Sequence, residues 1–325
     1  MTTAVRQKNA LQTTFARRER SLWGDAWKRL ARNRAAVSGM IMIAAFVLIA
    51  IFAPWLAPHG PLEIFPQNSF RPPMWVHSGN PARNGDPSFP LGTDSVGRDV
   101  LSRLLYGTRV SLVVGLIPLF PILVIGISIG LLSGYAGGQM DNLLMRFTDV
   151  IYAFPGLLFF IIMVTALRDT ALGKMLNGLL LLFVSLSLVA WVGVARLVRG
   201  QVLSLKEKEF IEAARMIGAD TGRIMLKHLL PNSLGPIIVA AAFLIPTSIM
   251  TEATLGFLGL GLRPPTDPHA IFPTSWGSLC LEGYAAINSQ PYLLLAPAVC
   301  IALMMLAFTF VGDGLRDALD PRMID

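Results

Sequence analysis

The strongest constraint on the fold is a recurrence of apolar runs of about twenty residues along the chain. The hydrocarbon core of a bilayer is about 30 Å thick, and a helix of about 20 residues crosses it. Only 14% of the 325 residues are charged, whereas a soluble domain carries about 25%. The mean hydropathy is +0.59. The sequence therefore argues against a large soluble enzyme and predicts an all-α integral membrane protein.

The apolar runs predict six transmembrane helices. Their approximate ranges are 35–57, 110–132, 149–167, 175–195, 236–260 and 293–311. The segments between them are polar and irregular, so they must lie where water satisfies the backbone N–H and C=O groups. A short interfacial helix is expected to begin after Asp99 and to lead into the second span. Pro118, Pro121 and Pro246 are expected to kink the spans that contain them.

The distribution of basic residues predicts the orientation. An even number of spans places both termini on one side, and that side then holds 19 of the 27 Lys and Arg residues. The positive-inside rule makes it the cytoplasm. Residues 1–34 become a basic cytoplasmic tail that can touch anionic lipid, and 312–325 a second cytoplasmic tail. Residues 58–105 become an extracytoplasmic loop. Because the basic cluster directly precedes an apolar run, it does not indicate nucleic-acid binding.

The cytoplasmic loop 196–235 is longer than a connection needs, and it reads as two helices. Phe210, Ala214 and Ile217 recur at helical spacing and form a narrow apolar stripe. Gly218 suits the left-handed residue just past a helix end, and Pro231 is expected to end the second helix. A short amphipathic helix with no local core to cover favours a partner protein. The alternative is a helix that lies on the lipid surface.

The residues of this loop resemble a known family. Glu212-Ala213-Ala214, then Gly218, then Leu230-Pro231 resemble the "EAA" motif of the membrane subunits of bacterial ABC importers, although the general pattern has an aliphatic residue where this chain has His228. In that family the short helix is the coupling helix, which sits in a cleft of the ATPase subunit. The resemblance implies the type I ABC importer permease fold. It assigns ATPase coupling to Phe210, Glu212, Ala213, Ala214, Ile217 and Gly218.

Further stretches narrow the resemblance to one branch. They are Ser21–Trp23, Asn33–Val37, Leu91–Asp94, Gly97–Asp99, Phe257–Gly261, Ser275–Gly277 and Gly312–Pro321. These stretches look like the peptide and nickel importers, and within them like the "C" permease of oligopeptide importers. The resemblance implies a bacterial inner-membrane subunit that moves oligopeptides or dipeptides by alternating access, or alternatively nickel or another small cargo. It implies as partners a second, homologous permease in a heterodimer, two ATPases and an extracytoplasmic peptide-binding protein.

The chain shows no sequence motif for hydrolysing ATP itself. Gly173-Lys174 lacks the upstream glycine and the following Ser or Thr of a phosphate-binding loop. We therefore expect no enzymatic activity and no cofactor on this chain, with ATP and Mg²⁺ bound by the partner ATPases. An ion channel would show a selectivity filter or rings of pore charges, and neither pattern is present. A purely structural scaffold would not need the long cytoplasmic loop.

Glu252 is the one acid well inside an apolar run. A charge at the centre of a transmembrane helix costs about 2.5–3.5 kcal/mol, so this side chain should face protein or a water-filled route. We expect it on the translocation path, or alternatively as a structural hydrogen-bonding acid. Asp94, Arg98 and Asp99 are expected to form caps and ion pairs at the outer mouth, and Cys280 is not expected to form a disulfide with Cys300.

Overall fold

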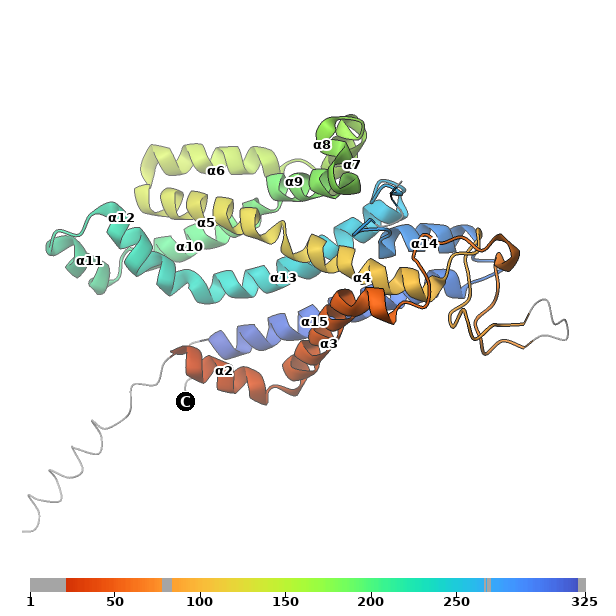
Figure 1. Ribbon diagram of the computed structural model, residues 1–325. Helices are drawn as coiled ribbons and strands as arrows, with labels where there is room; N and C mark the ends of the chain where they lie inside the picture. Colours follow the sequence, from red (N-terminus) through yellow and green to blue (C-terminus); the bar gives the residue numbers. More distant parts are fainter. Residues whose placement is uncertain (1–21, 78–83, 266, 268–269, 321–325) are drawn as a thin grey trace, which may run out of the picture.

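A computed structural model describes residues 22–77, 84–265, 267 and 270–320 of the chain (Figure 1). Most of the predicted basic tail, residues 1–21, and the last five residues lie outside the described residues. Within the described part, the regular structure is helical apart from one isolated bridge between Thr93 and Asp99. The all-α class predicted from the sequence is confirmed.

The helices fall into two groups by length. The longer ones are α2 Leu22–Arg32, α3 Arg34–Leu56, α4 Val100–Leu116, α5 Leu119–Ala136, α6 Gly138–Tyr152, α7 Gly156–Leu167, α9 Leu179–Val189, α10 Trp191–Leu205, α13 Leu230–Phe257, α14 Trp276–Ala285 and α15 Tyr292–Leu319. The shorter ones are η1 Pro66–Asn68, α8 Ala171–Lys174, η3 Met175–Gly178, α11 Glu209–Met216, α12 Thr221–Ile224 and the π-helical turn η4 Met225–Leu229.

Five helical segments of the described chain are long and apolar enough to cross a membrane, and a bent pair makes up to six. The five are Arg34–Leu56, Val100–Ala136, Ala171–Leu205, Thr221–Phe257 and Tyr292–Leu319. The bent pair is α6 with α7, which meet at 75°. The expected straight third span over 149–167 is therefore replaced by two helices at an angle. The break has a local cause, because Pro155 restricts the residue before it and donates no backbone hydrogen bond.

Several predicted boundaries shift because helices continue beyond their apolar cores. α4 begins at Val100, so the outer loop ends at Asp99 instead of at residue 105. The expected interfacial helix is the first part of α4, whose Leu104 is buried against the bundle. α10 runs on to Leu205, which leaves Lys206–Asp220 between the two long helical segments in place of 196–235. α15 likewise continues to Leu319.

Pro231 does not end a helix, contrary to the prediction. The helical segment Thr221–Phe257 passes through it without a break. The turn just before it, Met225–Leu229, is π-helical, and the backbone N–H of Leu230 bonds to the Met225 carbonyl. A π turn widens the helix where a proline ring would otherwise clash with the carbonyl four residues earlier. The chain therefore keeps one continuous rod where the sequence suggested a stop.

One closely packed helix pair joins α5 to α10 through glycines spaced four residues apart. Gly126, Gly130 and Gly134 of α5 face Val194, Val198 and Val202 of α10. A Cβ added at Gly130 would lie 2.6 Å from the Ala195 carbonyl oxygen and 2.7 Å from Cβ of Val198. Small residues of this kind let two helix backbones approach closely in a membrane.

The first and last helices are also tied together. α2 packs on the end of α15 through Leu30, which is buried in a cluster with Ala36 and Ala318. Further along, Gly39 of α3 lies against α15 so closely that an added Cβ would be 2.5 Å from the Ala307 carbonyl oxygen. The two ends of the described chain therefore lie on the same side of the bundle (Figure 1).

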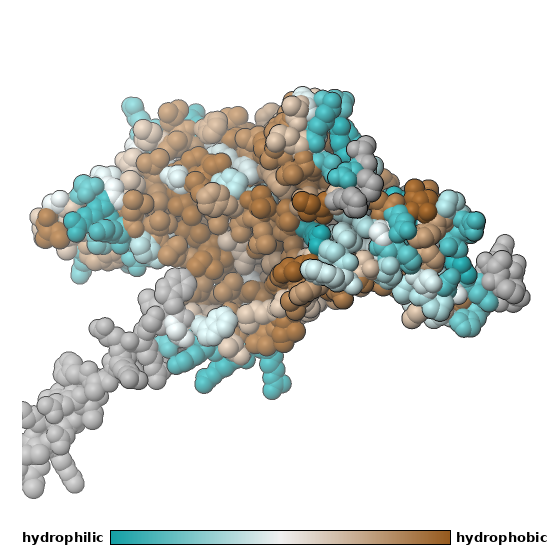
Figure 2. Space-filling view, in the orientation of Figure 1, coloured by the Kyte–Doolittle hydropathy of each residue, from teal (hydrophilic) through white to brown (hydrophobic). Residues whose placement is uncertain are grey.

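The long helices separate two polar ends. α11 and α12 lie at one end, and α14 with the loop between α3 and α4 lies at the other (Figure 1). Figure 2 shows a hydrophobic surface over the middle of the molecule and hydrophilic residues gathered toward its ends. This distribution is the one that a membrane-spanning bundle requires.

Candidate functional site

α11, at one tip of the molecule, has an inner face that fixes it to the bundle. Ile211 and Ala214 are buried, and they join the hydrophobic cluster that contains Val202 and Leu229. These contacts come from α10 and from the π-helical turn η4. α11 is therefore packed on the long helices that flank it in the sequence.

The outer face of α11 is uncovered and carries apolar side chains beside the charged Glu209, Glu212 and Arg215. The side chains of Met216 and Ile217 are each 86% exposed, and that of Phe210 is 43% exposed. Ala213 is exposed between them. Single exposed apolar residues are ordinary, but neighbouring ones at a tip make it a candidate surface for a partner.

The chain just past the end of α11 has the left-handed conformation predicted at Gly218. This residue has φ of +84°, its N–H donates to the Arg215 carbonyl at 3.0 Å, and the Ala219 N–H donates to the Ala214 carbonyl at 3.0 Å. This pair of hydrogen bonds is a Schellman motif, for which glycine is the preferred residue. Asp220 then caps α12, accepting a hydrogen bond from the Arg223 N–H at 3.2 Å.

The structure divides the predicted coupling residues between the two faces. It exposes Phe210, Glu212, Ala213, Ile217 and Gly218. Ala214 is instead buried, so it does not belong to the outer stripe on which the sequence placed it. The reason is that Ile211, three residues earlier, forms the inner stripe with Ala214. Met216 was missed, because it stands at the helix end where helical periodicity no longer separates one face from the other.

Cationic side chains connect this tip to α5 and α6. Arg215 lies over the ring of Tyr135 at 5.6 Å, and the Lys206 ammonium donates to the Gly134 carbonyl at 3.2 Å. The guanidinium of Arg199 in α10 holds Asp141 of α6 through two hydrogen bonds of 2.7 Å. The tip that carries α11 is thus linked to α5, and α10, which precedes it, is linked to α6.

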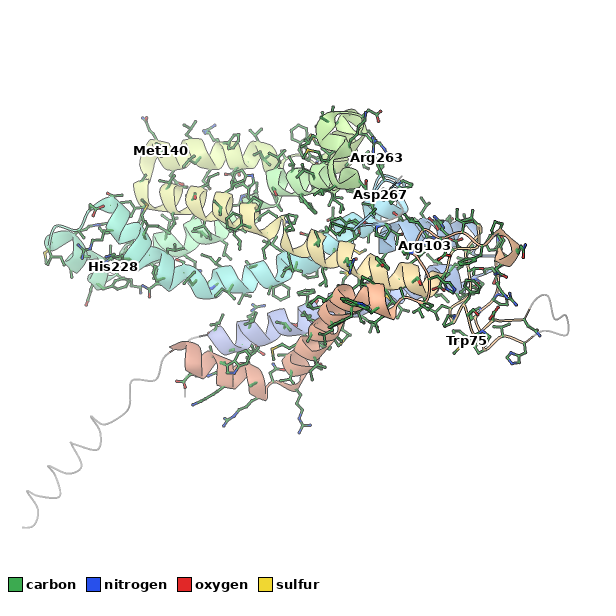
Figure 3. The ribbon with its side chains drawn as sticks, viewed as in Figure 1. Trp75, Arg103, Met140, His228, Arg263 and Asp267 are labelled. Carbon is green, nitrogen blue, oxygen red and sulfur yellow. The ribbon has the colours of Figure 1, made fainter. Side chains whose placement is uncertain are left out.

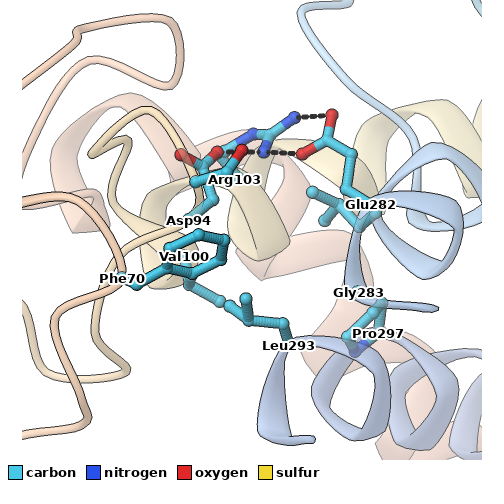
Figure 4. A pocket seen from close by; sticks show the side chains of 10 residues that line it. Phe70, Asp94, Val100, Arg103, Glu282, Gly283, Leu293 and Pro297 are labelled. Carbon is cyan, nitrogen blue, oxygen red and sulfur yellow. Dashed lines mark hydrogen bonds and ion pairs between the residues drawn. The ribbon is translucent and has the colours of Figure 1, made fainter. Parts of the chain in front are cut away.

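At the opposite end, four charged side chains form a compact cluster, of which Asp94, Arg103 and Glu282 are drawn in Figure 4. Arg103 of α4 is 3% exposed, and it bonds to Asp94 at 2.5 Å and to Glu282 of α14 at 2.5 and 2.9 Å. Arg98 bonds to the same two carboxylates at 2.7 and 3.0 Å. The predicted ion pairing of Asp94 and Arg98 is confirmed, whereas Arg103 and Glu282 were not anticipated.

The cluster joins elements of the fold to one another, and it does not form a site for cargo. Asp99, beside it, caps α4 by accepting from the Ser102 N–H at 3.0 Å, as predicted. The cavity lined by Phe70, Asp94, Arg103 and Glu282 has a volume of about 20 Å³ (Figure 4). Such a volume holds about one water molecule, and it is far too small for a peptide.

Glu252 lies inside the subunit. Its side chain is fully buried, and neither carboxylate oxygen has a hydrogen-bond partner among the described residues. Ser275, which caps α14, faces it, and a Cβ added at Gly261 would lie 3.7 Å from Oε1. Glu252 therefore sits between α13 and the turn that leads toward α14.

Comparisons with known proteins agree with this architecture. Residues 126–325 match the family described as binding-protein-dependent transport system inner membrane component, and residues 21–73 match the N-terminal TM domain of oligopeptide transport permease C. The oligopeptide transport system permease protein OppC of Haemophilus influenzae is 40% identical over 93% of this chain and 89% of its own length. The dipeptide transport system permease protein DppC of Alkalihalophilus pseudofirmus is 40% identical over 93% of this chain and 91% of its own.

A solved structure shows the same fold. A chain of the MetNI methionine ABC transporter, in an inward facing conformation, superposes with a TM-score of 0.51 at 21% identity and covers 68% of this chain and 96% of its own length. The chain thus has the fold of an ABC importer permease. On these matches, the chain belongs to the family of inner membrane components of binding-protein-dependent transport systems, and within it to the permeases of oligopeptide and dipeptide ABC importers.

Proposed function

We propose that this chain carries short peptides into the cell, and that partner ATPases drive it by gripping α11. The observation that carries the coupling proposal is the pair Met216 and Ile217, each 86% exposed on a helix whose other face is locked into the bundle. The cargo proposal is supported by the relatives, whose names specify oligopeptide and dipeptide transport.

The proposed assembly contains a second, homologous permease and two ATPase subunits, with ATP and Mg²⁺ bound by the ATPases. A shift of a two-state membrane domain from about 1:99 to 99:1 requires roughly 5.5 kcal/mol of differential binding. Nucleotide-driven closure of the ATPases would supply this free energy through α11. The bacterial plasma membrane is its site, with both termini and α11 on the cytoplasmic side. The gathering of α2, α11 and the end of α15 toward one end of the molecule supports this orientation (Figure 1).

The proposed path runs along the outer face of α13. The hydroxyls of Thr247, Thr251 and Thr254 are exposed on one side of this helix, each bonded to the carbonyl four residues earlier. Before Asp313, the exposed side of α15 carries by contrast large apolar side chains, as expected of a lipid-facing surface. It presents Leu295, Val299, Leu303 and Leu306. A hydroxyl-bearing face suits a water-filled route shared with the second permease.

Glu252 lies on the side of α13 that faces α14, away from these threonines. We therefore place this acid away from the proposed path. Its carboxylate packs beside the turn that contains Gly261 without a hydrogen bond among the described residues.

The experiment that tests coupling substitutes Gly218 by Trp. A Cβ at this position meets nothing within 4 Å, so the indole would project beside Ile217 and block a partner. We expect Gly218→Trp to abolish ATPase co-purification while the permease pair stays intact. Gly138→Trp is the matched control, because Gly138 also has positive φ and open space around it. Equal loss of the ATPases in both variants, or in neither, would overturn the coupling assignment.

A second experiment addresses cargo. Reconstituted transporter with its binding protein should accumulate labelled peptides of two to five residues in an ATP-dependent manner. A nickel chelate serves as competitor. Competition by the chelate without any peptide uptake would favour the nickel alternative.

A further inference from the structure

The loop between α3 and α4 carries an exposed apolar turn that the proposed transport cycle does not use. Met74, Trp75 and Val76 are consecutive, and their side chains are 46%, 61% and 38% exposed. We call these three residues the outer turn. Figure 3 places Trp75 on the outer loop, at the end of the molecule opposite His228 of the η4 turn.

The backbone of the outer turn is held firmly from below. The Met74 N–H donates to the Pro90 carbonyl at 3.2 Å, the Val76 N–H to the Pro73 carbonyl at 2.9 Å, and the Gly85 N–H to the Val76 carbonyl at 2.9 Å. The packing beneath is close, because a Cβ added at Gly85 would lie 2.6 Å from Cα of Met74. The loop thus fixes the position of these side chains without covering them.

The charges beside the outer turn are balanced. Arg71 pairs with Asp86 at 3.2 Å. The Ser88 N–H donates to the Asp86 carboxylate at 2.9 Å, and together with Arg71 this hydrogen bond lowers the pKa of Asp86 below its usual value. Asp86 therefore stays ionised at neutral pH and neutralises Arg71. Among the described residues, this pair leaves no net charge beside the outer turn that would attract anionic lipid.

Exposed Trp and Met in a polar loop have the composition of an interface core. Tryptophan is also one of the residue types enriched at the hot spots of protein–protein contacts. The family to which this chain belongs is defined by dependence on a binding protein, which must approach from the side opposite the ATPases. The outer turn lies at the end remote from α11 (Figures 1 and 3).

We propose that the outer turn is a docking contact for the extracytoplasmic binding protein, and that Trp75 inserts into an apolar pocket on that partner. This inference rests on the proposed function, since it names where one of the proposed partners binds. Because apolar contact dominates and the charges beside the outer turn are balanced, the affinity should depend little on salt concentration.

The test uses the complete transporter in lipid nanodiscs, with its purified binding protein added in increasing concentration. The concentration that gives half-maximal stimulation of ATP hydrolysis is measured for the parent protein, Trp75→Ala and Trp75→Phe. We expect Trp75→Ala to raise this concentration at least about tenfold at both low and high salt, and Trp75→Phe to raise it less. ATP hydrolysis without binding protein should stay unchanged.

Trp55→Ala is the matched control. Trp55 is 77% exposed near the end of α3, so its truncation removes the same group from a lipid-facing surface and should leave the half-maximal concentration unchanged. An unaltered value in Trp75→Ala would overturn the inference. Quenching of a fluorophore on Trp75→Cys by brominated lipid would overturn it as well, because the turn would then lie in the bilayer. If the binding protein fails to stimulate even the parent transporter, the proposed function fails instead.

Discussion

At the scale of single residues, the outer ion-pair cluster carries the clearest energetic consequence. Arg103→Met leaves the carboxylates of Asp94 and Glu282 close together with their main partner gone. Loss of one partner from a buried charge pair costs about 3–5 kcal/mol. Because Glu282 is 37% exposed, we expect the lower end of this range. Thermal unfolding of the purified complex measures the loss.

Arg98→Met is the control for this prediction. Arg98 is 20% exposed, and Asp94 keeps its bond to Arg103 when Arg98 is removed. We expect a loss of about 1 kcal/mol or less, in the range of partly exposed pairs. Equal losses in the two variants would show that Arg103 is not the centre of the cluster.

Glu252 allows a second residue-scale prediction. Neither of its carboxylate oxygens is hydrogen-bonded although the side chain is fully buried. An amide of the same shape has no ionised form to desolvate. We expect Glu252→Gln to keep or raise the midpoint of thermal unfolding and to change peptide uptake by less than about twofold. A loss of uptake by tenfold or more in a folded complex would return Glu252 to the translocation path.

At the scale of elements, the α5–α10 pair predicts a strict size limit. Gly130→Ala places a Cβ 2.6 Å from a backbone oxygen of α10, and a backbone cannot rotate away as a side chain does. Overpacking of this kind costs about 1–3 kcal/mol. Ser128→Ala, on the exposed side of the same helix, should be nearly neutral. The midpoints of thermal unfolding of the two variants, measured in detergent, test this prediction. Equal midpoints would contradict the close approach of α5 and α10.

The elements also show how far sequence reasoning reaches. The apolar cores of α3, α13 and α15 were located from hydropathy, because lipid imposes a length and a composition on each. α14 was missed. Its residues, Trp276–Ala285, follow a loop rich in proline and serine, and although Ser275 caps its first turn locally, the helix is packed by contacts far away in the sequence. The Trp276 indole donates to the Leu104 carbonyl at 3.0 Å, a contact that no local pattern reveals.

The proposed coupling site was predicted only in part, because some of its features also depend on contacts with residues distant in the sequence. The position of the helix and the left-handed glycine at 218 follow from local rules. The direction that each side chain faces depends on which neighbours α11 packs against, so the burial of Ala214 and the exposure of Met216 could not be read from spacing alone. Arg103 and Glu282 lie 179 residues apart, and their pairing needs the folded bundle.

At the scale of the whole molecule, the arrangement predicts which surfaces each compartment sees. In a background without Cys280 and Cys300, a membrane-impermeant maleimide applied to intact spheroplasts should label Trp75→Cys and not Ile217→Cys. Inverted vesicles should give the reverse. Labelling of both positions from the same side would contradict the proposed orientation.

The continuous segment Thr221–Phe257 has a mechanical consequence. Its 37 residues form a helical segment about 55 Å long. This segment follows α11 at one end and packs against α14 at the other. If this segment tilts as a rigid body about a point within the bilayer, its two ends move in opposite directions. A lateral displacement at the α11 end would then displace the α14 end the opposite way. The π turn just before Pro231 interrupts the regular α-helical hydrogen bonding of this segment. A more rigid π turn would transmit more of this displacement along the helix. A more flexible one would absorb the displacement before it reaches the opposite side of the membrane.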